Sequence, residues 1–311
     1  ITLHSESDPT TRLTAAEQSW TAAFRTPDPE LRQLFRQRLE HYRLTATDLT
    51  TFLDLINAGP EAIYRRLLLR APDEPLNLNL AYGNLIHQTF ERITRDDLSD
   101  DDALAYFHDQ AKTQPLISAE LRELQERGSH DLPIALQSFR EILRADPARA
   151  EVNFPGESLT AAGVPIGGKI DHINLYPDTK SLTVYDFKTG NYHPEKWSSH
   201  PTLYRYSLQL GFYKLLLAAS REYRNYQVTE GHILFVAPDP DGYVHDRAFE
   251  FTPETESELL DLIYAVYHAI TSLDFIDDPE LFLSANKSHT MRHLRAFAAT
   301  LTERYPRPTD R

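Results

Sequence analysis

The hydrophobic pattern of the chain changes after Gly156, and this change constrains the fold more than any other feature of the sequence. Before it, apolar residues recur at the spacing of a helix, as in Tyr82–Thr94. After it, Val164–Tyr176 and Leu182–Phe187 alternate apolar and polar residues, as strands with one buried face do. The turn residues Pro177–Lys180 separate these two segments, so the pattern predicts a β-hairpin.

The rest of the chain follows the same two patterns. Strands are predicted over Gly231–Ala237 and Tyr243–Phe251, with a helix over Leu203–Ala219 before them. Other helices are predicted over Pro29–Glu40, Leu44–Ile56, Glu61–Arg70, 103–145 with breaks near Gly128 and Pro133, Glu254–Leu273 and Thr290–Arg304. This order predicts an α/β domain with a central sheet.

Charge and residue usage exclude several classes of protein. The formal net charge is −14 over 311 residues, so any nucleic-acid contact must use a local basic path rather than the whole surface. The absence of cysteine excludes disulfides, thiolate zinc sites, iron–sulfur clusters and cysteine nucleophiles, and it suits a reducing cytoplasm. No apolar run approaches the roughly 18 residues of a membrane span, and the N-terminus has no signal pattern. We therefore expect a cytoplasmic protein with no membrane partner.

The first residue is Ile1, and the only methionine is Met291. We therefore expect a piece of a longer polypeptide, although a processed or trimmed chain would look the same. Residues 1–43 are polar and are expected to form a linker or docking arm before a domain over 44–311.

The predicted turn determines how the two strands of the hairpin pair. If Pro177–Lys180 forms the loop, Tyr176 lies opposite Ser181. The same register places Asp171 opposite Asp186, with Cβ atoms about 4.5–5.5 Å apart. Two carboxylates at this separation repel each other unless a cation lies between them, and hard divalent ions prefer oxygen ligands.

Lys188 projects from the same face as Asp186, because side chains alternate along a strand. An ammonium group beside two carboxylates suits a site where water attacks a phosphate group. The alternative is a surface hairpin with ordinary charged residues, since Asp-x-Lys alone is a common tripeptide. Gly167, Gly168 and Gly190 favour the site, because glycine allows close backbone approach.

Four short motifs follow one another along the chain: GNLIH at 83–87, GKID at 168–171, DFKTG at 186–190 and QLGFY at 209–213. Together they resemble the PD-(D/E)xK nuclease superfamily, and more narrowly the RecB-type nuclease domains of bacterial helicase–nucleases and the related CRISPR-adaptation exonucleases. The resemblance covers roughly residues 44–237. It implies a restriction-endonuclease-like core, in which helices flank a central mixed β-sheet. The implied domain has a helical part at 44–150, a catalytic core at 151–251 and closing helices at 252–311.

The resemblance also implies roles for individual residues. Asp171 and Asp186 are expected to bind Mg²⁺ or Mn²⁺ together with the backbone carbonyl of Phe187. His87 is expected to complete the coordination sphere, and an imidazole among oxygen ligands favours Mn²⁺. Without the resemblance, the sequence favours a structural role for His87, as a hydrogen-bonded histidine beside an apolar helix face. Lys188 is expected to orient or help to deprotonate the attacking water and to offset charge on the pentavalent phosphate.

Gln209 and Tyr213 are four residues apart, so they share one helix face. The resemblance gives them a catalytic role, either supporting the strand of Lys188 or contacting a DNA phosphate. Packing in the core is the alternative for Tyr213. Glu151, expected at the start of the first core strand, is a weaker candidate for a supporting role.

One departure from the family pattern is informative. Many relatives hold this domain together with a four-cysteine iron–sulfur cluster, including a Cys-Pro where this chain has Gly59-Pro60. A chain without cysteine cannot hold that cluster, so we expect helix packing to stabilise the region instead.

The candidate DNA-binding residues are basic or aromatic. The hairpin register places Lys169 opposite Lys188, and the other candidates are Arg65, Arg66, Arg70, Lys196 and Trp197. Aromatic side chains between basic groups can stack the bases of a single strand. Charge runs are more often solvated surfaces, however, and an acidic chain would bind DNA weakly alone. A helicase partner is therefore expected to provide most of the DNA binding.

The resemblance implies a metal-dependent deoxyribonuclease. It would be the nuclease domain of a larger helicase–nuclease in DNA repair and recombination, acting on single strands or ends. The helicase motor is expected in the same polypeptide or complex. Two alternatives stay open: a catalytically silent nuclease-like domain that binds DNA or scaffolds a helicase complex, and a stand-alone CRISPR-adaptation-type exonuclease.

Overall fold

The computed structural model describes residues 29–71, 76–193, 201–278 and 290–308, and these fall into two compact units. The helical unit comprises the described parts of Ile1–Tyr42, Asp48–Pro72 and Leu262–Arg311. The sheet unit comprises the described parts of Arg43–Thr47 and Asp73–Asp261.

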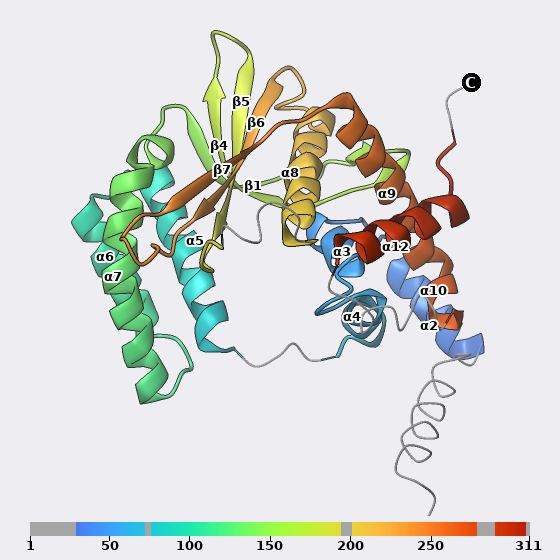
Figure 1. The fold of residues 1–311 in the computed structure, drawn as a ribbon, viewed down its shortest axis with the longest axis horizontal. Helices are drawn as coiled ribbons and strands as arrows, with labels where there is room; N and C mark the ends of the chain where they lie inside the picture. The colour runs from blue at the N-terminus through green and yellow to red at the C-terminus, as the bar shows by residue number, and fades with distance from the viewer. Residues whose placement is uncertain (1–28, 72–75, 194–200, 279–289, 309–311) are drawn as a thin grey trace, which may run out of the picture. The chain divides into compact units, whose positions relative to one another are not determined.

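The sheet unit is built on five strands, which Figure 1 shows. Their order across the sheet is β1 (Ala148–Asn153), β4 (Lys169–Tyr176), β5 (Ser181–Lys188), β6 (Gln227–Phe235) and β7 (His245–Phe249). β5 and β6 run parallel, whereas the other neighbouring pairs are antiparallel. The predicted α/β fold with a central mixed sheet is therefore confirmed.

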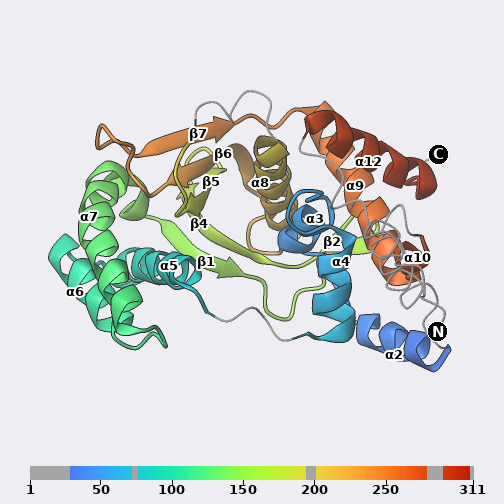
Figure 2. The same cartoon turned by 60° about the horizontal axis from the view of Figure 1, so that its bottom comes forward.

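Helices cover both faces of this sheet. Figure 2 shows α5 (Leu78–Asp96), α6 (Asp100–Ala111) and α7 (Ser118–Leu143) gathered on one side and α8 (Pro201–Ala219) on the other. Side-chain oxygens begin two of these helices, because Asn77 accepts a hydrogen bond at the start of α5 and Ser99 does so at the start of α6.

Strand β5 uses its two faces differently. Tyr185 and Phe187 are buried in the apolar core that α5, α6 and α7 share with the sheet. Asp186 and Lys188 alternate with them and contact Gln209 of α8. The two-residue period of the strand thus presents a carboxylate and an ammonium group to α8, while aromatic rings anchor the strand from the other side.

The region predicted as helix over 103–145 divides at a different place. The helix is interrupted at 112–117, and α7 continues through Gly128 and Pro133, so the predicted breaks at these two residues were wrong. Gly128 permits close packing, since a Cβ there would overlap the ring of Phe107. Pro133 is exposed, so the carbonyl that loses its helical partner lies on the solvent side of the helix.

The segment predicted as one strand over Val164–Tyr176 is also divided. It contains β3 (Val164–Pro165), which pairs with β2 (Thr160–Ala161), and then β4. The interruption occurs because Leu44 takes the backbone hydrogen bonds here: it donates to the last residue of β3 and accepts from Gly167. These residues therefore pair with a distant segment instead of extending β4.

The remaining helices are α2 (Pro29–Leu39), α3 (Ala46–Phe52), α4 (Pro60–Ile63), the π-helix η1 (Tyr64–Leu69), α9 (Pro253–Ser272), α10 (Asp274–Asp277) and α12 (Met291–Arg304). Apart from α10, these helices lie where the sequence predicts helix. β6 begins at Gln227, four residues before the predicted start at Gly231. No helix in the described ranges combines the length and the apolarity that crossing a membrane would need.

Hydrogen bonds and packing hold the segment that precedes α4 in the helical unit. The carboxylate of Asp54 accepts from the backbone N–H groups of Ile56 and Asn57. The N–H of Gly59 donates to the carbonyl of Thr51 in α3. Local capping of this kind fixes the turn from α3 into α4.

Gly128→Ala is expected to lower the free energy of unfolding by about 1–2 kcal/mol. The added methyl group must displace the buried ring of Phe107, and this overpacking exceeds the gain of about 1 kcal/mol from the helix propensity of alanine. Urea denaturation measures the difference, with Glu126→Ala on the exposed face of α7 as the control. Equal or greater stability of Gly128→Ala would contradict the tight packing of α6 on α7.

Candidate functional site

The candidate site lies where β4 and β5 stop pairing. Their antiparallel ladder has the register that the turn predicts, and it ends at His172 and Tyr185. Beyond this pair, the N–H of Phe187 donates to the carboxylate of Asp171 at 3.0 Å. A side chain thus takes the place of a ladder bond, next to the point where the register would bring Asp186 opposite Asp171.

Three side chains from three elements form a group with the composition of a metal site. His87 lies on α5, Glu151 on β1 and Asp171 on β4, and one ligand atom of each lies within 4.8 Å of the other two. His87 Nδ1 is 3.5 Å from Asp171 Oδ2 and 3.7 Å from Glu151 Oε1. These separations are too long for hydrogen bonds, but they suit ligands that share one ion.

Glu151 enters this group through a distorted strand. It is the fourth residue of β1, not the first as predicted, and its φ is +53°. Its neighbours in β1 pair with His172 and Ile170, so Glu151 lies across from Asp171. A non-glycine residue in this region costs about 1–3 kcal/mol, and such strain collects at functional sites. Alternation alone gave no sign of this backbone geometry, which is why the sequence placed Glu151 among the weaker candidates.

A second group lies on the α8 side of the sheet. The Oδ1 atom of Asp186 accepts hydrogen bonds from Gln209 Nε2 at 2.8 Å and from the Tyr213 hydroxyl at 3.1 Å. Gln209 Oε1 accepts from Lys188 Nζ at 3.0 Å, and the same ammonium group lies 2.7 Å from Asp186 Oδ2. Because Gln209 and Tyr213 are one turn apart, α8 directs both donors at one carboxylate.

The charges in this second group stabilise one another. Burial lowers the pKa of Lys188, but attraction to Asp186 and Tyr206 outweighs burial and leaves the pKa above its ordinary value. Burial and the nearby carboxylate raise the pKa of the Tyr213 hydroxyl well above its ordinary value. At neutral pH the group therefore contains a charged ammonium and a neutral phenol.

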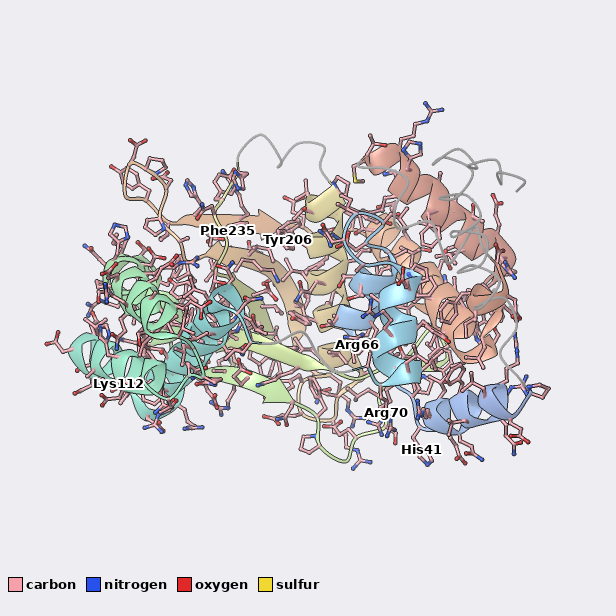
Figure 3. The ribbon with its side chains drawn as sticks, turned by 90° about the horizontal axis from the view of Figure 1, so that it is seen from below. His41, Arg66, Arg70, Lys112, Tyr206 and Phe235 are labelled. Carbon is pink, nitrogen blue, oxygen red and sulfur yellow. The ribbon has the colours of Figure 1, made fainter. Side chains whose placement is uncertain are left out.

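Aromatic rings lie beside this ammonium group. Lys188 Nζ is 5.1 Å from the centre of the Tyr206 ring, within the range of a cation–π interaction. The Tyr206 ring is in turn 6.3 Å from the ring of Phe235, and Figure 3 labels both residues.

Asp171 belongs to the first group, and its charge interacts with Asp186 and Lys188 of the second group. Burial and repulsion from Asp186 raise the pKa of Asp171 to about 6, although the Lys188 ammonium and the Phe187 N–H favour its ionised form. The two carboxylates are thus near enough to repel each other. A divalent cation relieves repulsion of this kind.

The carbonyl of Phe187 faces the same place. The carbonyl of Lys188 accepts from Val236, which follows β6. Successive residues of a strand direct their backbone groups to opposite edges, so Phe187 directs both its N–H and its carbonyl toward β4. The carbonyl expected among the ligands therefore points to the opened end of the hairpin.

The sequence predicted that Lys169 lies opposite Lys188, and this prediction was wrong. The β4–β5 ladder ends before Lys169 is reached, and Lys169 pairs with β1 instead. Its ammonium group forms an ion pair with Glu151, so it adds a positive charge to the first group.

The other predicted DNA-binding residues belong to the helical unit or lie outside the described residues. Arg65, Arg66 and Arg70 belong to the helical unit, where all three are exposed, and Figure 3 labels Arg66 and Arg70. Lys196 and Trp197 lie outside the described residues.

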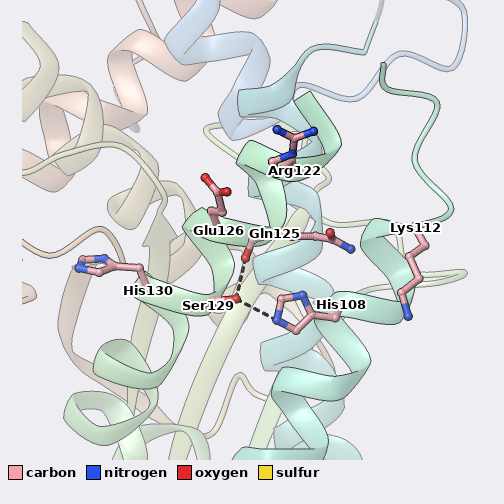
Figure 4. Close-up of a pocket in the computed structure, with 7 residues that line it drawn as sticks. All are labelled: His108, Lys112, Arg122, Gln125, Glu126, Ser129 and His130. Carbon is pink, nitrogen blue, oxygen red and sulfur yellow. Dashed lines mark hydrogen bonds between the residues drawn. The ribbon is translucent and has the colours of Figure 1, made fainter. Parts of the chain in front are cut away.

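A separate open groove lies between α6 and α7, and Figure 4 shows the residues that line it. They are His108, Lys112, Arg122, Gln125, Glu126, Ser129 and His130. None of them belongs to either group described above, so the groove is not part of the candidate site.

The sequence identifies the family. A sequence model of the PD-(D/E)XK nuclease superfamily matches residues 51–287, and the chain belongs to this superfamily. Among solved structures, the chain is similar to a "putative exonuclease" from Eubacterium rectale, with 11% sequence identity and a TM-score of 0.47. That match covers 83% of this chain and 87% of the other. No curated protein shows significant similarity to the chain.

Asp171→Asn is expected to stabilise the metal-free protein at pH 8 and to leave its stability nearly unchanged at pH 4. The raised pKa of Asp171 means that the folded state favours the neutral carboxyl. The contribution of Asp171 to the free energy of unfolding is therefore fully present below about pH 4 and is lost as the pH rises through about 6. Asparagine cannot ionise, and its carbonyl can still accept from Phe187.

Urea denaturation in EDTA at the two pH values measures the effect, which should reach about 1–3 kcal/mol at pH 8. Asp178→Asn, in the exposed turn of the same hairpin, is the control. If the variant is no more stable than the wild type at pH 8, then ionised Asp171 does not destabilise the folded protein.

Proposed function

We propose that the chain is a divalent-metal-dependent nuclease that hydrolyses DNA phosphodiester bonds. One observation supports this most strongly: a His87–Glu151–Asp171 group lies beside an ion-paired lysine at the opened end of a hairpin. Together they provide ligands for a cation and a fixed positive charge for a phosphate group. Membership of the nuclease superfamily agrees with this chemistry.

The residues of the site fit a divalent cation. The donor set is one imidazole with carboxylate oxygens, which suits Mg²⁺ or Mn²⁺ and, through the imidazole, favours Mn²⁺. In the part of the chain that the structure describes, Asp186 Oδ2 is buried and receives no hydrogen bond of good geometry, although the Lys188 ammonium is close to it. We infer that His87, Asp171, Asp186 and the Phe187 carbonyl hold the ion, with Glu151 as a further ligand. A bound ion supplies positive charge that polarises the phosphate and makes water more acidic.

Lys188 acts in this proposal as a cation. Its raised pKa keeps the ammonium protonated, so it offsets negative charge that develops on the phosphate and orients the attacking water. Gln209 and Tyr213 hold Asp186 and Lys188 in place through the hydrogen bonds described above. Their role is therefore to support the reacting groups, without contact to the substrate.

Two sequence motifs indicate which kind of nuclease domain this is. GNLIH at 83–87 and QLGFY at 209–213 favour a RecB-type nuclease domain that works with a helicase in DNA repair, in the cytoplasm. Single strands or DNA ends are then the expected substrates. Arg65, Arg66 and Arg70 are proposed to bind DNA phosphates, with Lys196 and Trp197 as further candidates. Lys169 adds charge beside Glu151.

Asp186→Asn and Lys188→Ala are each expected to lower the cleavage rate at least about 100-fold with the fold intact. Asparagine keeps the acceptor for Gln209 and Tyr213 but loses the charge that binds the ion and pairs with Lys188. The assay follows degradation of labelled single-stranded and duplex oligonucleotides in Mn²⁺, in Mg²⁺ and in EDTA, and circular dichroism monitors the fold.

Asp178→Asn and Lys112→Ala, which change exposed residues of the same types, are the controls and should cleave normally. Full activity of pure Asp186→Asn would refute the site. A wild-type protein that is folded and binds Mn²⁺ but cleaves nothing would instead favour the catalytically silent domain.

Glu151→Gln is expected to weaken Mn²⁺ binding about tenfold or more, because the amide removes one anionic ligand while keeping the size of the side chain. Isothermal titration calorimetry measures the affinity, and Glu126→Gln in α7 is the control. Unchanged affinity would assign Glu151 to the ion pair with Lys169 alone.

A further inference from the structure

Arg127 of α7 reaches the end of the strand that carries Lys188. Its Nη2 atom donates a hydrogen bond of 2.6 Å to the carbonyl of Thr189, the residue after Lys188. The carbonyl of Lys188 is still bonded to Val236 beside β6, and β5 ends at Lys188. Arg127 therefore holds the chain at the first residue beyond the sheet.

The guanidinium group is itself held on several sides. It lies 3.8 Å from the centre of the Tyr82 ring, and its Nη1 donates to Asn79 Oδ1 at 3.2 Å. Its Nε lies 3.4 Å from the buried carboxylate of Asp131, which also accepts from the Tyr82 hydroxyl at 2.8 Å. A planar group with fixed neighbours on α5 and α7 loses little further freedom when it binds the Thr189 carbonyl.

The same region brings α5 close to the strand end. A Cβ at Gly83 would lie 3.4 Å from Thr189 Oγ1, so glycine permits the approach of the two segments. His87 lies one turn further along α5, in the group of candidate ligands. Arg127 thus joins the helix that bears His87 to the strand that bears Lys188.

We propose that Arg127 is a positioning residue, which sets the location of the Lys188 ammonium by anchoring the Thr189 carbonyl. The proposal rests on the nuclease function proposed above. Transition-state stabilisation by a fixed charge depends on its placement to within about 0.5 Å, and small displacements lower rates steeply. Arg127 contacts neither the proposed metal ligands nor the substrate in this account, so it acts through the strand end.

Arg127→Ala, Arg127→Lys and the control Arg122→Ala test this role. Arg122 lies on the exposed face of α7 that borders the groove of Figure 4. Arg127→Ala should lower kcat at least tenfold, with KM and Mn²⁺ affinity within about twofold of the wild type. Arg127→Lys, which keeps the charge and one donating nitrogen atom, should recover part of kcat. Arg122→Ala should match the wild type in all three quantities.

Hydrogen–deuterium exchange of peptides covering 186–193 gives a readout that needs no catalysis. Exchange should be faster in Arg127→Ala than in the wild type and Arg122→Ala, while peptides from β1 stay unchanged. Unchanged kcat or unchanged exchange in Arg127→Ala would overturn the proposal. Parallel losses of kcat, Mn²⁺ affinity and thermal stability would also overturn it, since they indicate structural support alone. A wild type that cleaves nothing would contradict the nuclease function, and the exchange result would still decide whether Arg127 anchors Thr189.

Discussion

Repulsion between two carboxylates, Asp171 and Asp186, is the interaction on which the organisation of this site depends. Both acids follow directly after the last pair of a hairpin ladder whose register is set by a four-residue turn, so the fold brings them close together. The surrounding residues limit the repulsion in two ways. Asp171 accepts from a backbone N–H, and Asp186 is held by Gln209, Tyr213 and an ammonium group.

Residues from both sides of the sheet meet at the candidate site. From one side, α5 brings His87 to the opened end of the hairpin, and a distorted β1 adds Glu151. From the other side, α8 fixes the pair formed by Asp186 and Lys188. The candidate ligands and the Asp186–Lys188 ion pair thus meet where β4 and β5 separate, and Asp186 belongs both to this pair and to the proposed ion site. The parallel β6 keeps β5 in place up to Lys188, which allows the hairpin to open without loosening the lysine.

Much of this arrangement could be predicted from local pattern. The turn at 177–180 fixed the hairpin register, and the four-residue spacing of Gln209 and Tyr213 placed both on one helix face. Predictions failed where distant segments decided the outcome. α7 continues through Gly128 because Phe107 packs there, and Glu151 joins the site because its backbone departs from regular strand geometry. Neither effect leaves a periodic signal in the sequence.

In the proposed site, Asp171 and Asp186 share one divalent cation with His87. Anomalous scattering from a crystal soaked in Mn²⁺, measured at the manganese edge, tests this most directly. One strong peak is expected at the opened end of the hairpin, within bonding distance of both carboxylates and of the His87 imidazole. A peak elsewhere on the protein, or none beside these carboxylates at saturating Mn²⁺, would contradict it.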